Sequence, residues 1–104
     1  MKRIIKKGKF YWHRDNSIKG FHPSYVYKKN DKTNKYNIVC FTSSYGKRRT
    51  KLYKNINPYS NNNCYVLNTP RIIKRKNFGD ELYGYKVTDY RDKARIRYIA
   101  NKKQ

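Results

Sequence analysis

The sequence predicts a mainly β protein of the α+β class, built as a small, strongly twisted β barrel with one C-terminal helix. Three observations predict it. Short runs rich in Tyr, Val, Ile and Phe recur along the chain, turn-forming clusters of Asn, Asp, Ser and Gly separate them, and a helical spacing appears only near the end. The length of 104 residues suits one domain, so we expect residues 1–104 to fold as a single unit.

Six segments have the composition and length of β-strands. In chain order they are 9–13, 24–29, 35–42, 48–54, 64–69 and 71–76. Pro23 precedes the second segment, and its missing N–H suits the first position of a strand. The third segment alternates most clearly. Its alternate side chains are expected on one face, namely Tyr36, Ile38, Cys40 and Thr42. Val39 and Phe41 are expected on the opposite face.

The segment 88–103 has the spacing of a helix instead. Tyr90, Ala94 and Tyr98 follow one another at intervals of four, which places them in one stripe along a helix. Ile99 lies on the flank of this stripe. We therefore expect the chain to end in a helix behind the barrel.

The ends of this helix carry suitable residues. Thr88 or Asp89 can cap its N-terminus, and Asp92 favours the positive end of the helix dipole. Lys and Arg crowd its C-terminal half, where the dipole stabilises cations. Because a small barrel buries little area, we expect many of the 12 Tyr rings to cover it, with the apolar body inward and the hydroxyl in water.

The charge of the chain indicates a polyanionic partner. The formal net charge is +21, from 27 Lys and Arg against six Asp and Glu. Nucleic acid is the natural candidate, because phosphates attract Lys and Arg and release counterions on contact. An acidic protein that neutralises this surface is an alternative. High charge also occurs in disordered chains, but such chains are poor in aromatic residues, and here these make up 16%.

Several classes of site and location are disfavoured. No segment predicts a membrane span, a signal peptide or an amphipathic helix with a large apolar face, so we expect a cytoplasmic protein without membrane contact. Cys40 and Cys64 form no disulfide framework and lack metal-site spacing, so we expect two free, partly buried thiols. With few carboxylates, no P-loop and no dinucleotide turn, we expect neither a metal nor a cofactor.

Three motifs, in this order and at this spacing, give the chain a resemblance to a known family. They are "GKFYWHRDN" (8–16), "KGFHPSYVY" (19–27) and "KYNIVCFTSS" (35–44). Together they resemble the first strands of MazF/PemK-type toxin endoribonucleases, a superfamily that includes Kid-like and ToxN-like proteins. The stretch 65–85 is similar to the last strands of that family. The resemblance covers roughly residues 7–100, although no single motif is specific.

The resemblance implies a fold, an activity and partners. The fold is an SH3-like barrel, commonly a homodimer, and the activity is metal-free cleavage of single-stranded RNA. An acidic antitoxin, protein or RNA, would restrain the enzyme. The resemblance also implies that the residue before Pro23 and the hydroxyl that ends the third strand line the active site. Many family members have Arg before this proline, whereas this chain has His22.

Metal-free RNA cleavage needs a base for the 2′-OH, donors for the charge on the phosphorane, and an acid for the leaving 5′-oxygen. The two histidines of the chain, His13 and His22, could serve as base and acid, because imidazole titrates near neutral pH. Thr42 and Ser43 could donate hydrogen bonds to a phosphate oxygen. The alternative is that both histidines are ordinary surface residues and that Thr42 satisfies only its own turn.

Other residues are candidates for RNA binding by charge or by stacking. They are Arg14, Lys19, Lys47, Arg48, Arg49, Tyr11 and Trp12. For Arg48 and Arg49 the alternative is a solvated strand face, and for Trp12 it is a place in the barrel core.

Three functional hypotheses remain open. The first is a metal-independent endoribonuclease toxin of a toxin–antitoxin system that cleaves single-stranded RNA. The second is a non-catalytic, basic nucleic-acid-binding protein on the same barrel, associated with ribosomes or encoded by a phage. The third is an interaction protein that binds an acidic partner. All three require positive charge, so the charge alone does not distinguish them.

Overall fold

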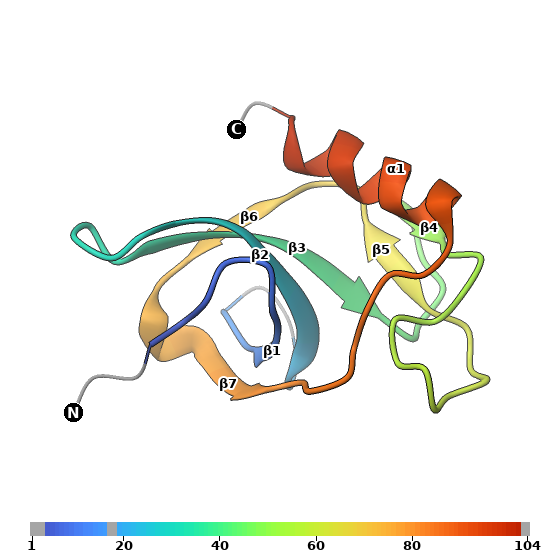
Figure 1. The fold of residues 1–104 in the computed structure, drawn as a ribbon, viewed down its shortest axis with the longest axis horizontal. Coiled ribbons are helices and arrows are strands. Elements are labelled where there is room, and N and C mark those ends of the chain that lie inside the picture. The colour runs from blue at the N-terminus through green and yellow to red at the C-terminus, as the bar shows by residue number, and fades with distance from the viewer. Residues whose placement is uncertain (1–3, 17–18, 103–104) are drawn as a thin grey trace.

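The computed structural model describes residues 4–16 and 19–102, which form a β-rich fold with one C-terminal α-helix (Figure 1). The elements in chain order are β1 (Phe10–His13), β2 (His22–Asn30), β3 (Lys35–Thr42), β4 (Arg49–Lys51), β5 (Tyr65–Leu67), β6 (Arg71–Ile73), the 3₁₀ helix η1 (Arg75–Asn77), β7 (Phe78–Glu81) and α1 (Tyr90–Ala100). The mainly β class and the C-terminal helix are therefore confirmed.

All seven strands belong to one antiparallel sheet. Six of them follow the order β4-β5-β3-β2-β1-β7, and β6 is outside this order and pairs with β3. Ile38 pairs with both Val26 of β2 and Arg71 of β6, so these two strands lie on opposite edges of β3. The end of β3 pairs instead with β5, through Phe41 and Val66. Among the described residues no pairing joins the two ends of the sheet. It is therefore open, and the prediction of a closed barrel is wrong in this respect.

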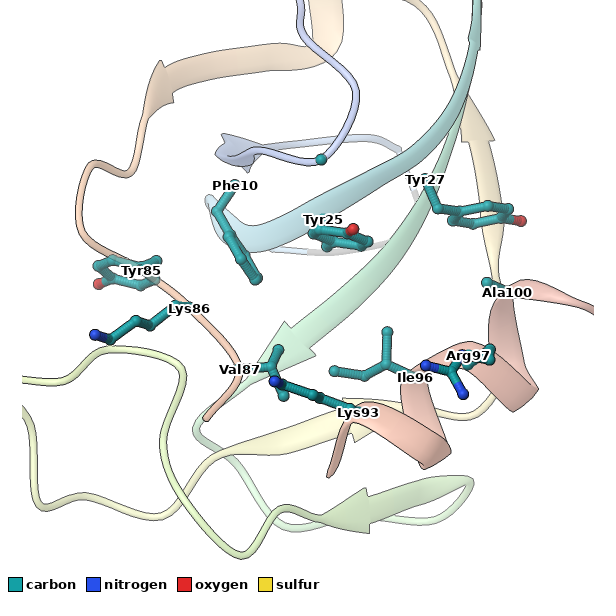
Figure 2. A pocket seen from close by; sticks show the side chains of 11 residues that line it. Phe10, Tyr25, Tyr27, Tyr85, Lys86, Val87, Lys93, Ile96, Arg97 and Ala100 are labelled. Carbon is teal, nitrogen blue, oxygen red and sulfur yellow. The ribbon is translucent and has the colours of Figure 1, made fainter. Parts of the chain in front are cut away.

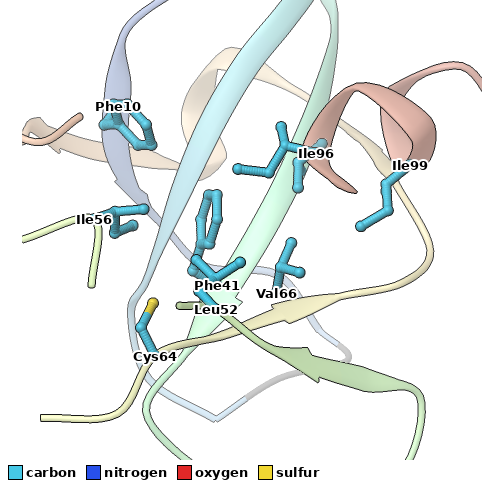
Figure 3. Close-up of a cluster of buried hydrophobic side chains, with 9 residues drawn as sticks. Phe10, Phe41, Leu52, Ile56, Cys64, Val66, Ile96 and Ile99 are labelled. Carbon is cyan, nitrogen blue, oxygen red and sulfur yellow. The ribbon is translucent and has the colours of Figure 1, made fainter. Parts of the chain in front are cut away.

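The alternation predicted for 35–42 is confirmed, but both faces of β3 are buried. Val39 and Phe41 belong to a cluster that α1 covers, here called the helix-side core (Figure 3). Its members are Phe10, Val39, Phe41, Leu52, Ile56, Cys64, Val66, Ile96 and Ile99. The opposite face of β3 carries a second cluster, the opposite core, which consists of Ile5, Tyr11, Val26, Tyr36, Ile38, Cys40, Ile73 and Phe78. Such a strand reads as a nearly continuous apolar run, as β3 does.

Aromatic rings hold the opposite core together. The ring centroids of Tyr11 and Tyr36 each lie 5.5 Å from that of Phe78, in edge-on geometry. The predicted role of Tyr rings as a cover is confirmed only in part. Tyr11 and Tyr36 are buried, whereas other Tyr side chains, such as Tyr59 and Tyr45, are among the most exposed large side chains.

Helix α1 has the predicted position, but its buried face differs from the predicted stripe. Tyr90 and Tyr98 are 78% and 60% exposed, and Ala94 is exposed as well. The buried side chains are Asp92, Ile96 and Ile99. Branched aliphatic side chains bury more completely than Tyr, whose hydroxyl favours water, so the isoleucine face packs on the sheet. In the described part of the chain no helix is long and apolar enough to cross a membrane.

Two carboxylates fix the start of α1. Asp89 is the N-cap and accepts a hydrogen bond from the backbone N–H of Arg91 at 2.8 Å. The buried carboxylate of Asp92 accepts hydrogen bonds from the backbone N–H groups of Tyr53 and Lys54, at 2.9 and 3.0 Å. Asp92 therefore ties the loop after β4 to the helix, in addition to its predicted interaction with the helix dipole.

Several strand boundaries differ from the prediction. Strand β2 begins at His22, so Pro23 lies inside the strand, opposite Trp12, instead of before it. Strands β4, β5 and β6 are each shorter than predicted. Strand β7 was not among the predicted segments because its sequence contains a glycine and two acidic residues, which strands disfavour. Gly79 is needed there, since a Cβ atom would lie 2.9 Å from the Cβ of Trp12 in the neighbouring strand.

Candidate nucleic-acid interface

The start of β2 and the end of β3 border two adjoining pockets. The first, here called the histidine pocket, has a volume of about 410 Å³. It is lined by His13, Lys19, His22, Cys40, Phe41, Thr42, Ser44, Arg49 and Leu67. Five of the sequence-predicted site residues therefore line one pocket, although they come from four different strands and one loop.

The second pocket, here called the loop pocket, has a volume of about 370 Å³ and shares His22, Phe41 and Thr42 with the first. The predicted residues Trp12 and Ser43 line it. Its other lining residues are Phe21, Pro23, Asn55, Ile56, Asn57, Ser60, Asn62, Asn63, Cys64 and Tyr85. The shared residues make the two pockets parts of one groove.

His22 is half-buried between the two pockets. Its Nε2 atom lies 2.9 Å from the carbonyl oxygen of Lys19, and a carbonyl oxygen can only accept, so Nε2 carries a proton and donates it. Nδ1 makes no hydrogen bond to any residue in the described part of the chain. In the neutral ring, Nδ1 is then the nitrogen that can accept a proton from a ligand.

Thr42 ends β3 and is 6% exposed. Its Oγ1 atom accepts a long hydrogen bond, 3.3 Å, from the backbone N–H of Ser44. This is the local turn interaction that is the alternative to an active-site role for the hydroxyl. Because a hydroxyl both accepts and donates, this contact leaves its O–H available as a donor. The neighbouring Ser43 is exposed at the edge of the loop pocket.

His13 has a different environment, because it is fully buried. Its Nδ1 atom lies 2.8 Å from the carbonyl oxygen of His22, and its Nε2 atom lies 3.5 Å from Sγ of Cys40. Nδ1 must therefore be the donor, and Nε2 accepts from the thiol. Burial lowers the pKa of His13 to about 4 and raises the pKa of Cys40 to about 12, so both are neutral at pH 7. These contacts favour a structural role for His13, which holds the backbone of His22 in place.

The predicted cations are divided between the pocket and the surrounding surface. Arg49 lines the histidine pocket, and its guanidinium donates a hydrogen bond of 2.8 Å to the carbonyl oxygen of Ser44, which orients it along the 44–49 turn. Lys19 lines the same pocket from the opposite loop. Three further candidates are exposed but line neither pocket, namely Arg14, Lys47 and Arg48.

The predicted aromatic residues also differ in position. Tyr11 is 3% exposed, and its hydroxyl accepts a hydrogen bond of 2.8 Å from the backbone N–H of Lys6, so its ring has no free face for a base. Trp12 is half-buried and lines the loop pocket next to Phe21, which is 52% exposed. Phe21 and the amides of residues 55–63 were not predicted as site residues. The Asn-rich composition of that loop predicted a turn, and the same Asn side chains could have been recognised as hydrogen-bonding groups for a ligand.

Comparison of the chain with protein-family models and with curated proteins found no match. The MazF/PemK resemblance therefore remains a prediction from the sequence motifs. In residues 4–16 and 19–102, no three His, Cys, Asp or Glu side chains gather in a group that could hold a metal ion. The fold and the groove define a small, strongly basic, mainly β protein whose pocket combines an imidazole, a hydroxyl and two cations.

Proposed function

We propose that the protein binds single-stranded RNA in the groove formed by the histidine and loop pockets and cleaves it there without a metal ion. One observation carries the proposal: His22, Thr42 and Arg49 come from three different strands but line the same pocket, together with Lys19. A net charge of +21 supports a polyanionic substrate. The more specific proposal, an SH3-like toxin endoribonuclease of the MazF/PemK type, is supported only by the sequence motifs.

The proposed reaction is an internal transesterification. Nδ1 of His22 takes the proton of a ribose 2′-OH, and the 2′-oxygen attacks the neighbouring phosphorus. Lys19, Arg49 and the Thr42 hydroxyl donate hydrogen bonds to the phosphorane oxygens, where negative charge increases. The P–O5′ bond breaks, and the leaving 5′-oxygen takes a proton from water. The hydroxide that remains takes the proton held by His22, which regenerates the neutral imidazole. The products are a 2′,3′-cyclic phosphate and a 5′-hydroxyl.

The decisive substitution is at His22. If His22 transfers the proton, His22→Ala and His22→Arg both lower the cleavage rate by roughly 10²- to 10⁴-fold, the usual contribution of an acid–base group. If the position supplies only charge, His22→Arg retains activity. Cleavage is followed on a labelled single-stranded RNA in EDTA, and mass spectrometry identifies the product ends.

A matched control is Lys32→Ala, because Lys32 is exposed in the β2–β3 turn and lines none of the pockets. This variant should cleave at the wild-type rate. Activity that disappears in EDTA and returns with Mg²⁺ would contradict the proposed mechanism. Full activity in His22→Ala would remove this residue from it.

We also propose, with the toxin reading, an acidic antitoxin of protein or RNA, a homodimer and a cytoplasmic location. The charge supports an acidic partner of either class, and the resemblance alone supports the dimer. Light scattering of the purified chain tests the dimer. An acidic protein that binds tightly to a chain without affinity for RNA would favour the interaction-protein hypothesis instead.

The burial of His13 supports a second candidate, a non-catalytic module that binds single-stranded nucleic acid. With His13 fully buried, His22 is the one imidazole left in the described residues that a substrate can reach. A groove with a single proton-transfer group is sufficient for binding, whereas cleavage then depends on water as the acid. Tight, salt-dependent RNA binding without any cleavage would establish this candidate.

A further inference from the structure

A third pocket lies on the helix side of the sheet, between β1, β2 and α1 (Figure 2). Its volume is about 460 Å³, and we call it the aromatic pocket. Figure 2 shows the rings of Phe10, Tyr25 and Tyr27 projecting from β1 and β2 into the space beside α1, with Tyr85 beyond Phe10. Helix α1 contributes apolar surface at its side through Ile96.

The rings of this pocket are only partly packed. Tyr25, Tyr27 and Tyr85 are all half-buried, so each keeps part of its ring accessible. The ring centroid of Phe10 lies 5.1 Å from that of Tyr25 and 6.4 Å from that of Tyr85, so three rings form one continuous aromatic surface. Tyr27 occupies the irregular position of β2 between Val26 and Lys28, where the register with β3 shifts.

The rim of the aromatic pocket is cationic. Lys86 comes from the segment before α1, and Lys93 and Arg97 are neighbours one turn apart on the helix. The pocket lining contains no carboxylate. An occupant must therefore offer a flat or apolar group to the rings and negative charge to the rim.

We propose that the aromatic pocket binds an unpaired nucleobase of a single-stranded RNA, with the adjacent phosphates on Lys86, Lys93 and Arg97. This inference rests on the proposed RNA-binding function and extends it to a second subsite. Bases stack on aromatic side chains in proteins that bind single strands, while cations follow the backbone. The volume of about 460 Å³ is adequate for one nucleotide.

The position of Tyr85 supports one strand that occupies both subsites. Tyr85 lines the aromatic pocket and the loop pocket, so the two are neighbours across a single side chain. The loop pocket in turn shares His22 and Thr42 with the histidine pocket. An acidic peptide would also match the cationic rim, but it would not account for this continuity with the groove.

The test uses a 2′-O-methyl hexauridine with a fluorescent label, which the proposed reaction cannot cleave because it lacks the 2′-OH. Tyr27→Leu removes a ring and keeps an apolar side chain, and we expect its Kd to rise about 5- to 150-fold, the range for one lost base–aromatic stack. Tyr27→Phe keeps the ring and should bind within about twofold of wild type. Tyr98→Leu is the matched control, because Tyr98 is an exposed ring on α1 outside the pocket.

A second pair of variants tests the rim without touching the sheet. Arg97→Ala and Arg95→Ala remove the same charge from the same helix, but only Arg97 lines the pocket. Arg97→Ala should reduce the slope of log K against log salt by about 0.7, the value for one phosphate contact on a single strand, and Arg95→Ala should change it much less. This pair decides the matter if circular dichroism shows that Tyr27→Leu is misfolded.

The inference would be overturned if Tyr27→Leu and Tyr98→Leu lost the same affinity and Arg97→Ala and Arg95→Ala changed the salt slope equally. Unchanged binding by Tyr27→Leu would also overturn it. So would tight binding of a Glu/Leu-rich peptide that Tyr27→Leu abolishes while oligonucleotide binding persists. The outcome is separable from that of the proposed function, since binding is measured on a probe that is not cleaved. If Tyr27→Leu loses probe binding and the wild-type protein never cleaves RNA, the proposed subsite is supported and the proposed reaction is wrong.

Discussion

His13 and His22 face each other in the β1–β2 pairing and both line the histidine pocket, but His13 is fully buried there and His22 is only half-buried. His13 is enclosed by the carbonyl of His22 and the thiol of Cys40. The same residue type thus has two roles, decided by burial and by hydrogen-bond partners. Each role leads to its own measurement.

The burial of His13 predicts a loss of stability in mild acid. Its pKa is about 4 in the folded chain against 6.5 in the unfolded chain, so between these values the unfolded state binds more protons. The free energy of unfolding is therefore unaffected by His13 above pH 6.5 and falls as the pH drops from 6.5 to 4. The expected loss is about 3 kcal/mol, measured by urea unfolding across this range.

His13→Asn is the variant that isolates this effect. Its amide can still donate to the carbonyl of His22, but it does not titrate. We expect it to be less stable than wild type at pH 7 and to have a flat stability profile between pH 6.5 and 4.5. A wild-type profile as flat as that of the variant would show that His13 is not buried as described.

The Thr42 hydroxyl should matter more than the methyl group of this side chain. Thr42→Val keeps the shape and removes the O–H, and we expect the cleavage rate to fall by about 10²- to 10³-fold, as for one lost donor to an oxyanion. Thr42→Ser keeps the donor and should lose far less. Rates are measured on the same labelled RNA after circular dichroism confirms the fold, and equal rates in all three proteins would reduce Thr42 to its turn contact with Ser44.

At the scale of elements, the attachment of α1 depends on a carboxylate. Asp92→Ala removes two charge-assisted hydrogen bonds to the backbone N–H groups of Tyr53 and Lys54. We expect the free energy of unfolding to fall by about 3 kcal/mol, since a hydrogen bond to a charged group contributes about 1.5–3 kcal/mol. Asp80→Ala removes an exposed carboxylate and should change it by less than about 0.5 kcal/mol, so equal effects in urea unfolding would contradict the role of Asp92.

The elements differ in how well their sequences predicted them. The bounds of β3 were predicted correctly, because its alternating apolar residues are enclosed by clear turn signals. The existence of α1 was predicted from its spacing, but its buried face was not, since Tyr and Ile both satisfy an apolar pattern and only packing chooses between them. Strand β7 depends on Gly79 fitting against Trp12, a tertiary contact that no local pattern reveals.

The candidate site shows the same limit. Only the family resemblance implied that Thr42 and His22 line one site, and both line the same two pockets. An alternating pattern indicates that two side chains share one face of a strand, but it does not indicate whether another layer of the protein covers that face. For this reason the burial of Tyr11 and His13 in the sheet could not be predicted.

At the scale of the whole molecule, charge should dominate RNA binding. If about six phosphates are neutralised on a single strand, log K should fall with log salt at a slope of roughly −4. Fluorescence anisotropy between about 50 and 300 mM salt measures this slope. A flat dependence would remove nucleic acid as the main partner, despite the net charge of +21.

Strand β3 hydrogen-bonds with β2, β5 and β6, and its partners appear at different times during synthesis of the chain. The β2–β3 hairpin is complete once residue 42 has left the ribosome. Val66 and Ile73, which lie opposite Phe41 and Tyr36 on the other edge, are made later. Until then the nascent chain presents one unpaired edge beside apolar side chains, a state prone to aggregation. Translation that pauses between these points should therefore increase the demand for chaperones far more than a pause after residue 81.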